Sequence, residues 1–169
     1  MAITPSVIGA HLLFERDGYI LLGKRVPDAL YAPDTWHVPA GGVEYEPATA
    51  GAAREGFEEL AVTIREKDLE LVHTVHMLDP GGDGVPKLQM FFRVHAWQGS
   101  PYIAEPDKCS ALDWFAWDSL PTPLVDYTRT ALDGVRAGRA FTALGWPAAE
   151  APYPAVAMPT SAPVEEGTR

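Results

Sequence analysis

The chain has 169 residues, the length of one ordinary domain with a single main core. Hydrophobic residues make up 47% and charged residues 21% of the sequence, which is close to the average globular composition and excludes fibrous, collagen-like and wholly disordered chains. The 13 Lys and Arg residues are outnumbered by 23 Asp and Glu residues, giving a net charge of -10. This charge argues against DNA or RNA polymers as partners, because basic side chains supply most non-specific affinity for phosphate backbones.

The sequence also bears on where the protein works. The longest apolar stretch, residues 7–14, contains His11 and falls well short of the roughly 20 residues of a membrane helix. The first residues lack the basic segment and cleavage site of a secretory signal, and the single cysteine, Cys109, cannot form an internal disulfide. We therefore expect a cytoplasmic protein that does not enter a membrane.

The first predicted elements are two strands joined by a tight turn. Residues 7–14 and 19–22 are apolar and flank Asp17-Gly18, a dipeptide favoured in two-residue hairpin turns. Residues 36–39 are predicted to form a short third strand. Residues 47–60 are predicted as a helix, since proline suits a first helical turn and no cluster of β-branched residues interrupts the segment.

The second half of the sequence predicts three more strands and a second helix. Residues 69–77 and 88–97 form a further pair of strands, and 88–97 alternates as a half-buried strand does. Residues 114–117 are a short strand, and 126–137 are the closing helix. Strands interspersed with two helices favour an α/β fold with a mixed sheet between helices.

The composition changes after Trp146. Residues 147–169 contain five of the 16 prolines and show neither helical nor strand periodicity. We therefore divide the chain into a folded domain, 1–146, and a Pro/Ala-rich tail, 147–169.

Three carboxylates stand out on the first predicted helix. On a helix advancing about 100° per residue, Glu55, Glu58 and Glu59 share one face. The opposite, core-facing side would hold Ala50, Ala53, Phe57 and Leu60. Like charges at this spacing repel, and a hard cation such as Mg²⁺ would compensate them, although a solvated helix face is the simpler interpretation of the spacing alone.

The residues around these carboxylates resemble the Nudix box. That pattern is Gly, five residues, Glu, seven residues, Arg-Glu, an aliphatic residue, any residue, Glu-Glu, any residue, Gly and an aliphatic residue. Glu46, Arg54-Glu55, Glu58-Glu59 and Val62 match it in residue type and spacing. The likeness extends over residues 5–140.

Three positions depart from the box. Only four residues separate Gly41 from Glu46, Gly56 replaces the aliphatic residue, and Ala61 replaces the closing glycine. None of these departures removes an expected ligand, but Gly56 lowers helix propensity by about 1 kcal/mol and Ala61 occupies a position chosen for turn freedom. They leave the geometry of the loop open.

The resemblance implies an α/β/α sandwich around a mixed sheet, and the hydrolysis of a diphosphate linked to another group. It implies that Glu55, Glu58 and Glu59 bind Mg²⁺, with Mn²⁺ as an alternative, and that Ala40 or Gly41 adds a backbone carbonyl. A further ligand is expected from the loop after the long strand, where we choose Glu105 over Asp107. An ordinary loop acid is an equal alternative for Glu105.

The implied mechanism is water attack at phosphorus, with metal ions neutralising phosphate oxygens and activating the water. We favour Glu55 as the general base, with Glu59 and Glu105 as alternatives. Arg54 is expected to orient the neighbouring carboxylates, through Glu46.

The substrate-binding residues are less well defined by the sequence. Lys24 and Arg25, at the end of the second strand, are candidates for phosphate binding, although a solvated strand end is an equal reading. A base could stack on Trp36, Tyr31, Phe14, Phe91 or Trp97, each of which is more often a core residue. Asp126 is a candidate for accepting a hydrogen bond from a purine amine. The chain has no asparagine, the residue with which relatives acting on oxidised guanine nucleotides commonly read the base.

We therefore expect the substrate to be a nucleoside di- or triphosphate or a nucleotide sugar, and a prenyl or other non-nucleotide diphosphate is the alternative. Two further readings are a non-catalytic ligand-sensing Nudix module and the isomerase branch of the fold, which would need a reactive cysteine. A second copy of the chain, in a homodimer, is a further candidate partner.

Overall fold

The computed structural model describes residues 4–79 and 84–147, so nearly all of the predicted tail lies outside the described residues. The elements in chain order are β1 (Val7–Arg16), β2 (Tyr19–Arg25), β3 (Trp36–His37), β4 (Ala40–Gly42), α1 (Ala48–Leu60), the 3-10 helix η1 (Glu66–Asp68), β5 (Leu69–Met77), β6 (Lys87–Val94), β7 (Cys109–Ala116), α2 (Asp126–Arg136) and β8 (Phe141–Leu144). No helix in the described part of the chain is long and apolar enough to cross a membrane.

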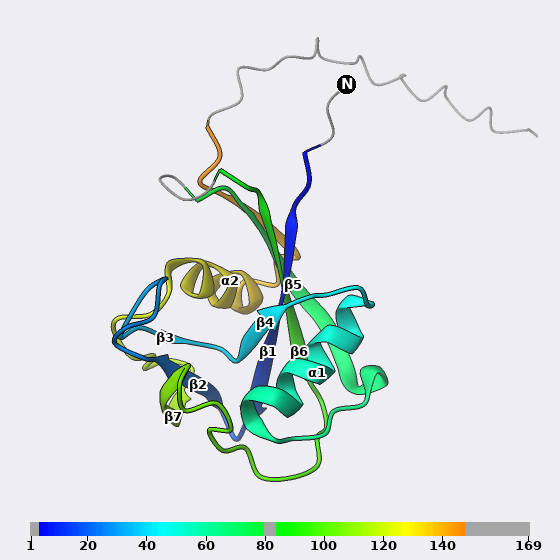
Figure 1. Cartoon of the computed structure of the whole chain (residues 1–169), viewed down its shortest axis with the longest axis vertical. Helices are drawn as coiled ribbons and strands as arrows, with labels where there is room; N and C mark the ends of the chain where they lie inside the picture. The colour runs from blue at the N-terminus through cyan, green and yellow to red at the C-terminus, as the bar shows by residue number, and fades with distance from the viewer. Residues whose placement is uncertain (1–3, 80–83, 148–169) are drawn as a thin grey trace, which may run out of the picture.

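The strands form a mixed sheet with helices on both faces. The hydrogen-bonded order is β3-β2-β1-β6-β5-β8, with β4 added to β1 and β7 added to β2. The β1–β6 and β5–β8 pairs are parallel and the others are antiparallel. Figure 1 shows α1 on one side of the sheet and α2 on the other, so the predicted α/β/α sandwich is confirmed.

The predicted hairpin forms at Asp17-Gly18, where both residues have positive φ (51° and 81°), as the favoured two-residue turn requires. Beyond the turn β1 pairs with β2 only at Glu15 and Arg16, whereas near its start β1 pairs with β4. Strands β2 and β4 therefore pair with opposite ends of β1 and lie apart. Strand β2 pairs in addition with β3 and β7.

The core lies in two clusters, one on each face of the sheet. Leu12 and Phe92 belong to the cluster under α1, while Leu13 and Phe91 belong to the cluster under α2. Strands β1 and β6 are therefore covered on both faces. The predicted half-buried alternation of β6 is wrong, because α2 covers the second face.

The orientation of α1 also differs from the prediction. Phe57, assigned to the core side, is 62% exposed, whereas Glu55 is buried together with Ala52, Gly56 and Leu60. Gly56 makes this packing feasible, because a Cβ there would lie 2.6 Å from the Cδ1 atom of Ile64. Ile64 thus fills the space that an aliphatic residue at position 56 would occupy.

The remaining differences are at element boundaries. Strand β7 begins at Cys109 rather than at 114, and β6 ends at Val94 rather than at 97. Strand β4, helix η1 and strand β8 were not predicted, and the strand predicted at 36–39 is limited to β3 at Trp36–His37. Strand β8 has only four residues and is held by pairing with β5, a tertiary contact that no local pattern signals.

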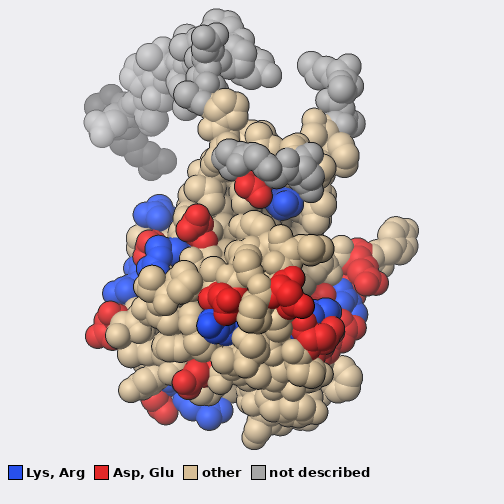
Figure 2. Space-filling model, turned by 60° about the vertical axis from the view of Figure 1, so that its left-hand side comes forward, with Lys and Arg blue, Asp and Glu red and all other residues tan. Residues whose placement is uncertain are grey.

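Figure 2 shows acidic and basic side chains side by side on the face that it presents. The net negative charge is therefore not gathered there into one uniform patch.

Candidate active site

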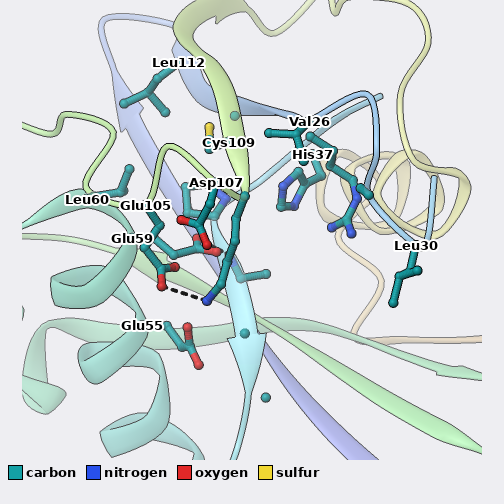
Figure 3. Close-up of a pocket in the computed structure, with 18 residues that line it drawn as sticks. Val26, Leu30, His37, Glu55, Glu59, Leu60, Glu105, Asp107, Cys109 and Leu112 are labelled. Carbon is teal, nitrogen blue, oxygen red and sulfur yellow. Dashed lines mark hydrogen bonds and ion pairs between the residues drawn. The ribbon is translucent and has the colours of Figure 1, made fainter. Parts of the chain in front are cut away.

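A cavity of about 400 Å³ lies between the second half of α1, strand β4 and the start of β7. Its charged lining residues are Arg25, Glu55, Glu59, Glu105, Asp107 and Lys108. Figure 3 shows Glu55 and Glu59 coming from α1, and Glu105 and Asp107 coming from the loop before β7, on the same side of this cavity. The cavity therefore collects carboxylates from two segments far apart in the sequence.

Glu55 lies directly against the backbone of Gly41. A Cβ built on Gly41 would be 1.9 Å from the carboxyl carbon of Glu55, so only glycine leaves room for this carboxylate. Burial raises the pKa of Glu55, and the neighbouring Arg54 guanidinium opposes that rise. Gly41 thus provides the space into which the first helix carboxylate fits.

Arg54 connects the helix to the preceding loop. Its guanidinium donates hydrogen bonds to Glu46 (2.6 and 3.0 Å), Glu55 (2.8 Å) and Glu58 (3.0 Å), and to the carbonyl oxygen of Gly42 (2.8 Å). The hydrogen bonds from Arg54 hold the pKa of Glu46 below its usual range. Arg54 therefore has the orienting contacts that the sequence predicted, including the one to Glu46.

Glu59 is held against the backbone of β4. Its Oε2 atom accepts a hydrogen bond from the backbone N–H of Ala40 at 2.9 Å. Burial raises the pKa of Glu59 to about 8, and the charges of Glu55 and Glu105 add to this effect. In the absence of a further cation, Glu59 is mostly protonated at neutral pH.

The loop before β7 is fastened to the end of α1. The backbone N–H of Ala104 donates to the carbonyl of Glu59 (3.0 Å), and that of Tyr102 donates to the carbonyl of Leu60 (3.3 Å). These bonds bring Glu105 to the helix carboxylates. The Oε1 atom of Glu105 accepts a hydrogen bond from Lys108 (2.7 Å), whereas its Oε2 atom is buried and has no partner among the described residues.

Glu58 and two of the predicted substrate-binding residues lie elsewhere. The Glu58 side chain is 47% exposed and bonds Arg54 rather than lining the cavity, so the three helix carboxylates do not share one face of the site. Lys24 pairs with Asp34 at 3.2 Å. Trp36 packs edge-on against Phe115, with ring centroids 4.8 Å apart.

A second chamber continues from the carboxylate cavity along β4. Arg25, His37 and Gly41 line both spaces. The second chamber is also lined by His11, whose Nε2 atom lies 2.8 Å from Gln89 Oε1. Burial lowers the pKa of His11 to about 4 and that of His37 to about 3, so both rings are neutral at pH 7.

The chamber ends in an aromatic region. Tyr127 and Gln89 line both this chamber and a small adjoining cavity. In the adjoining cavity the rings of Tyr31 and Tyr127 are nearly parallel, with their centroids 6.3 Å apart. Asp126, the predicted residue, is exposed, and its neighbour Tyr127 is the one that faces the cavity.

Several residues that line the cavity and the second chamber were not identified from the sequence. Lys108 follows Glu105 by three residues, a spacing that permits an ion pair but does not say which way it faces. Gln89 carried little signal, because it falls on the polar side of the predicted alternation of 88–97. Tyr127 carried no signal, because an aromatic residue in a helix is most often core.

The residues fit a divalent cation by their chemistry. Glu55, Glu59, Glu105 and the Gly41 carbonyl offer only oxygen donors, which Mg²⁺ prefers, and the buried Glu105 Oε2 has no other partner. Within residues 4–79 and 84–147, no three acidic, His or Cys side chains are gathered closely enough to hold a metal as they stand. Binding would therefore draw the carboxylates toward one another.

Comparisons with known proteins identify the family of this chain. A family model described as NUDIX domain matches residues 4–133. The crystal structure of the MutT NUDIX hydrolase from Burkholderia pseudomallei is 35% identical, with a TM-score of 0.69, and the match covers 76% of this chain and 97% of that chain.

Two more distant structures share the fold. The solution structure of the E. coli ORF135 protein is 24% identical with a TM-score of 0.61, and the match covers 80% of this chain and 94% of that one. The MutT protein from Methanosarcina mazei Go1 is 18% identical with a TM-score of 0.66, and the match covers 81% and 97% of the two chains.

Proposed function

Because this chain belongs to the Nudix family of hydrolases, which act on diphosphate linkages, we propose that it is a Mg²⁺-dependent pyrophosphohydrolase of a nucleoside di- or triphosphate or a related nucleotide derivative. The observation that carries the proposal is the placement of Glu55, Glu59 and Glu105 around one cavity that opens into an aromatic, hydrogen-bonding chamber.

The bound cation would neutralise phosphate oxygens and lower the pKa of a water molecule. The protein's own residues position the reacting groups. Arg54 bonds Glu55 Oε1 and leaves Oε2 as the oxygen that takes the proton, so Glu55 is our choice of general base. Glu59 and Glu105 remain alternative bases. Glu58 helps to orient Arg54 through the hydrogen bond between them. As a metal ligand, Glu58 would act only from the outer edge of the cation site.

The second chamber supports a nucleotide over a prenyl diphosphate. Its lining includes the neutral His11, the buried Gln89 and the ring of Tyr127, which together offer stacking and hydrogen bonds to a planar heterocycle. A prenyl chain would make no use of these polar groups, of which His11 and Gln89 already bond each other in the free site.

Arg25 is the predicted substrate-binding residue that the cavity supports best, since it lines both the carboxylate cavity and the second chamber. It would meet the phosphates where the two spaces join. Lys24 and Asp126 are at the periphery, and Trp36 is assigned to packing. A cytoplasmic location and a homodimer remain predictions from the sequence.

The test is release of phosphate or pyrophosphate from a panel of nucleoside triphosphates, nucleotide sugars, dinucleoside polyphosphates and prenyl diphosphates. EDTA and the variants E55Q and E59Q should abolish the release, whereas E70Q, the same change at an exposed residue of β5, should retain it. Unchanged release in both E55Q and E59Q would contradict the site. Ligand binding without release would favour a sensing module, and release from prenyl diphosphates alone would replace the nucleotide.

A further inference from the structure

Lys108 lies among the carboxylates of the site, in a position that neither the Nudix box nor the sequence analysis anticipated. Its Nζ atom is 2.7 Å from Glu105 Oε1. The backbone N–H of Lys108 also donates to the carbonyl of Glu105 (3.0 Å), so the local turn holds the two residues together. The lysine therefore faces the cavity because of the same loop that places Glu105 there.

The charges of the cavity explain why a lysine is held at this point. Glu59 and Glu105 have no bond to Arg54, whose guanidinium serves Glu55, Glu46 and Glu58. Arg25 donates its Nε–H to the carbonyl of Tyr31 instead of a carboxylate. The pKa of Lys108 is raised, first by Glu105 and then by Glu59 and Glu55, so the ammonium senses all three carboxylates.

Two further observations concern how firmly this lysine is held. Its side chain is 62% exposed, so the ammonium can leave Glu105 for water while breaking little packing. The second oxygen of Glu105 is buried without a partner among the described residues, so one lysine leaves the carboxylate only partly satisfied.

We propose that Lys108 is the resident counter-ion of Glu105, and that it competes with the divalent cation for this carboxylate. Lys108 is a positioning residue: it keeps the carboxylates together in the metal-free enzyme, and its charge on Glu105 Oε1 opposes binding of the cation at the free Oε2. The inference rests on the proposed Mg²⁺ dependence. Its consequence is that Lys108 weakens metal affinity, and this sets the Mg²⁺ concentration that the enzyme requires.

The experiment is calorimetric titration of the metal-free full-length protein with MgCl₂ alone, without substrate. K108M removes the competing charge, so it should bind Mg²⁺ about three- to tenfold more tightly than the unmodified protein. K108Q should change the affinity in the same direction, and K108R, which keeps the charge, should stay close to the unmodified protein. K67M removes an equal charge from η1, away from the cavity, and should leave the affinity unchanged.

The direction of the effect separates this role from a merely structural one, because damage to the site would weaken metal binding. Equal or weaker Mg²⁺ affinity in both K108M and K108Q, alongside clear binding by the unmodified protein, overturns the inference and leaves the proposed function standing. Absence of Mg²⁺ binding by the unmodified protein overturns both.

Discussion

Glu59 gives a prediction in which stability and function oppose each other. Its folded pKa of about 8 lies well above the ordinary value of 4.5, because the carboxyl is buried beside two other carboxylates. Below pH 4.5 this group is protonated in both the folded and the unfolded chain, so it does not lower the free energy of unfolding. As the pH rises from 4.5 to 8, the unfolded chain releases a proton that the folded chain retains, so stability falls.

The size of this loss follows from the two pKa values. Each tenfold change in proton affinity is worth about 1.4 kcal/mol, so the full loss above pH 8 is at most about 5 kcal/mol. Relaxation of the site relieves part of this cost, and we expect about 2–4 kcal/mol. E59Q removes the ionisation while keeping an oxygen to accept from Ala40, so it should be the more stable protein by this amount at pH 8.5 and equal to the unmodified protein at pH 4.5.

The assay is urea unfolding of both proteins in EDTA across this pH range, with E58Q as the control because Glu58 is largely exposed. Saturating Mg²⁺ should stabilise the unmodified protein more than E59Q. It should therefore narrow or reverse the difference between their free energies of unfolding at pH 8.5. A difference that does not change with pH, or a less stable E59Q at pH 8.5 in EDTA, would refute the argument.

Three further predictions come from other positions. Gly41→Ala places a methyl group against the carboxylate of Glu55, so phosphate release should fall at least about tenfold while the melting temperature changes little. Activity within twofold of the unmodified protein would show that the Glu55 carboxylate can function in a different position. Ala61 ends α1 in the left-handed conformation (φ 53°), so Ala61→Gly should raise the free energy of unfolding by about 1 kcal/mol in thermal denaturation, and a lowered melting temperature would contradict this. The pKa of His11 is lowered to about 4 by burial, so the folded chain excludes a proton that the unfolded chain binds, and stability should fall by about 3 kcal/mol as the pH drops from 6.5 to 4. His11→Asn, which does not titrate there, should flatten that part of the urea-unfolding profile, and an unchanged slope would assign the acid sensitivity to other groups.

Much of the local structure was predictable, because it depends on residues close in sequence. Asp17-Gly18 closes the first hairpin because both positions take positive φ, and Pro47 directly precedes α1. The contact between Arg54 and Glu58 also follows from helical spacing. The box pattern identified the carboxylate-bearing helix and, through the resemblance, the sandwich that surrounds it.

The amphipathic reading of α1 failed for a physical reason. A helical pattern shows which residues share a face, but which face is buried depends on what packs against it. Glu55 is buried because Gly41 leaves space for its carboxylate, and Ile64 packs against Gly56, while Phe57 is left exposed.

The sequence by itself determined the order of most elements, the family and the three acidic positions of the helix. Only the tertiary structure decided that Glu59 and Glu105 meet, since this depends on backbone hydrogen bonds between the end of α1 and a loop more than forty residues later. It likewise decided that Lys108 takes the place beside Glu105. Spacing along a chain fixes neighbours within a helix or turn, whereas the balance of charge in a cavity depends on every segment that folds around it.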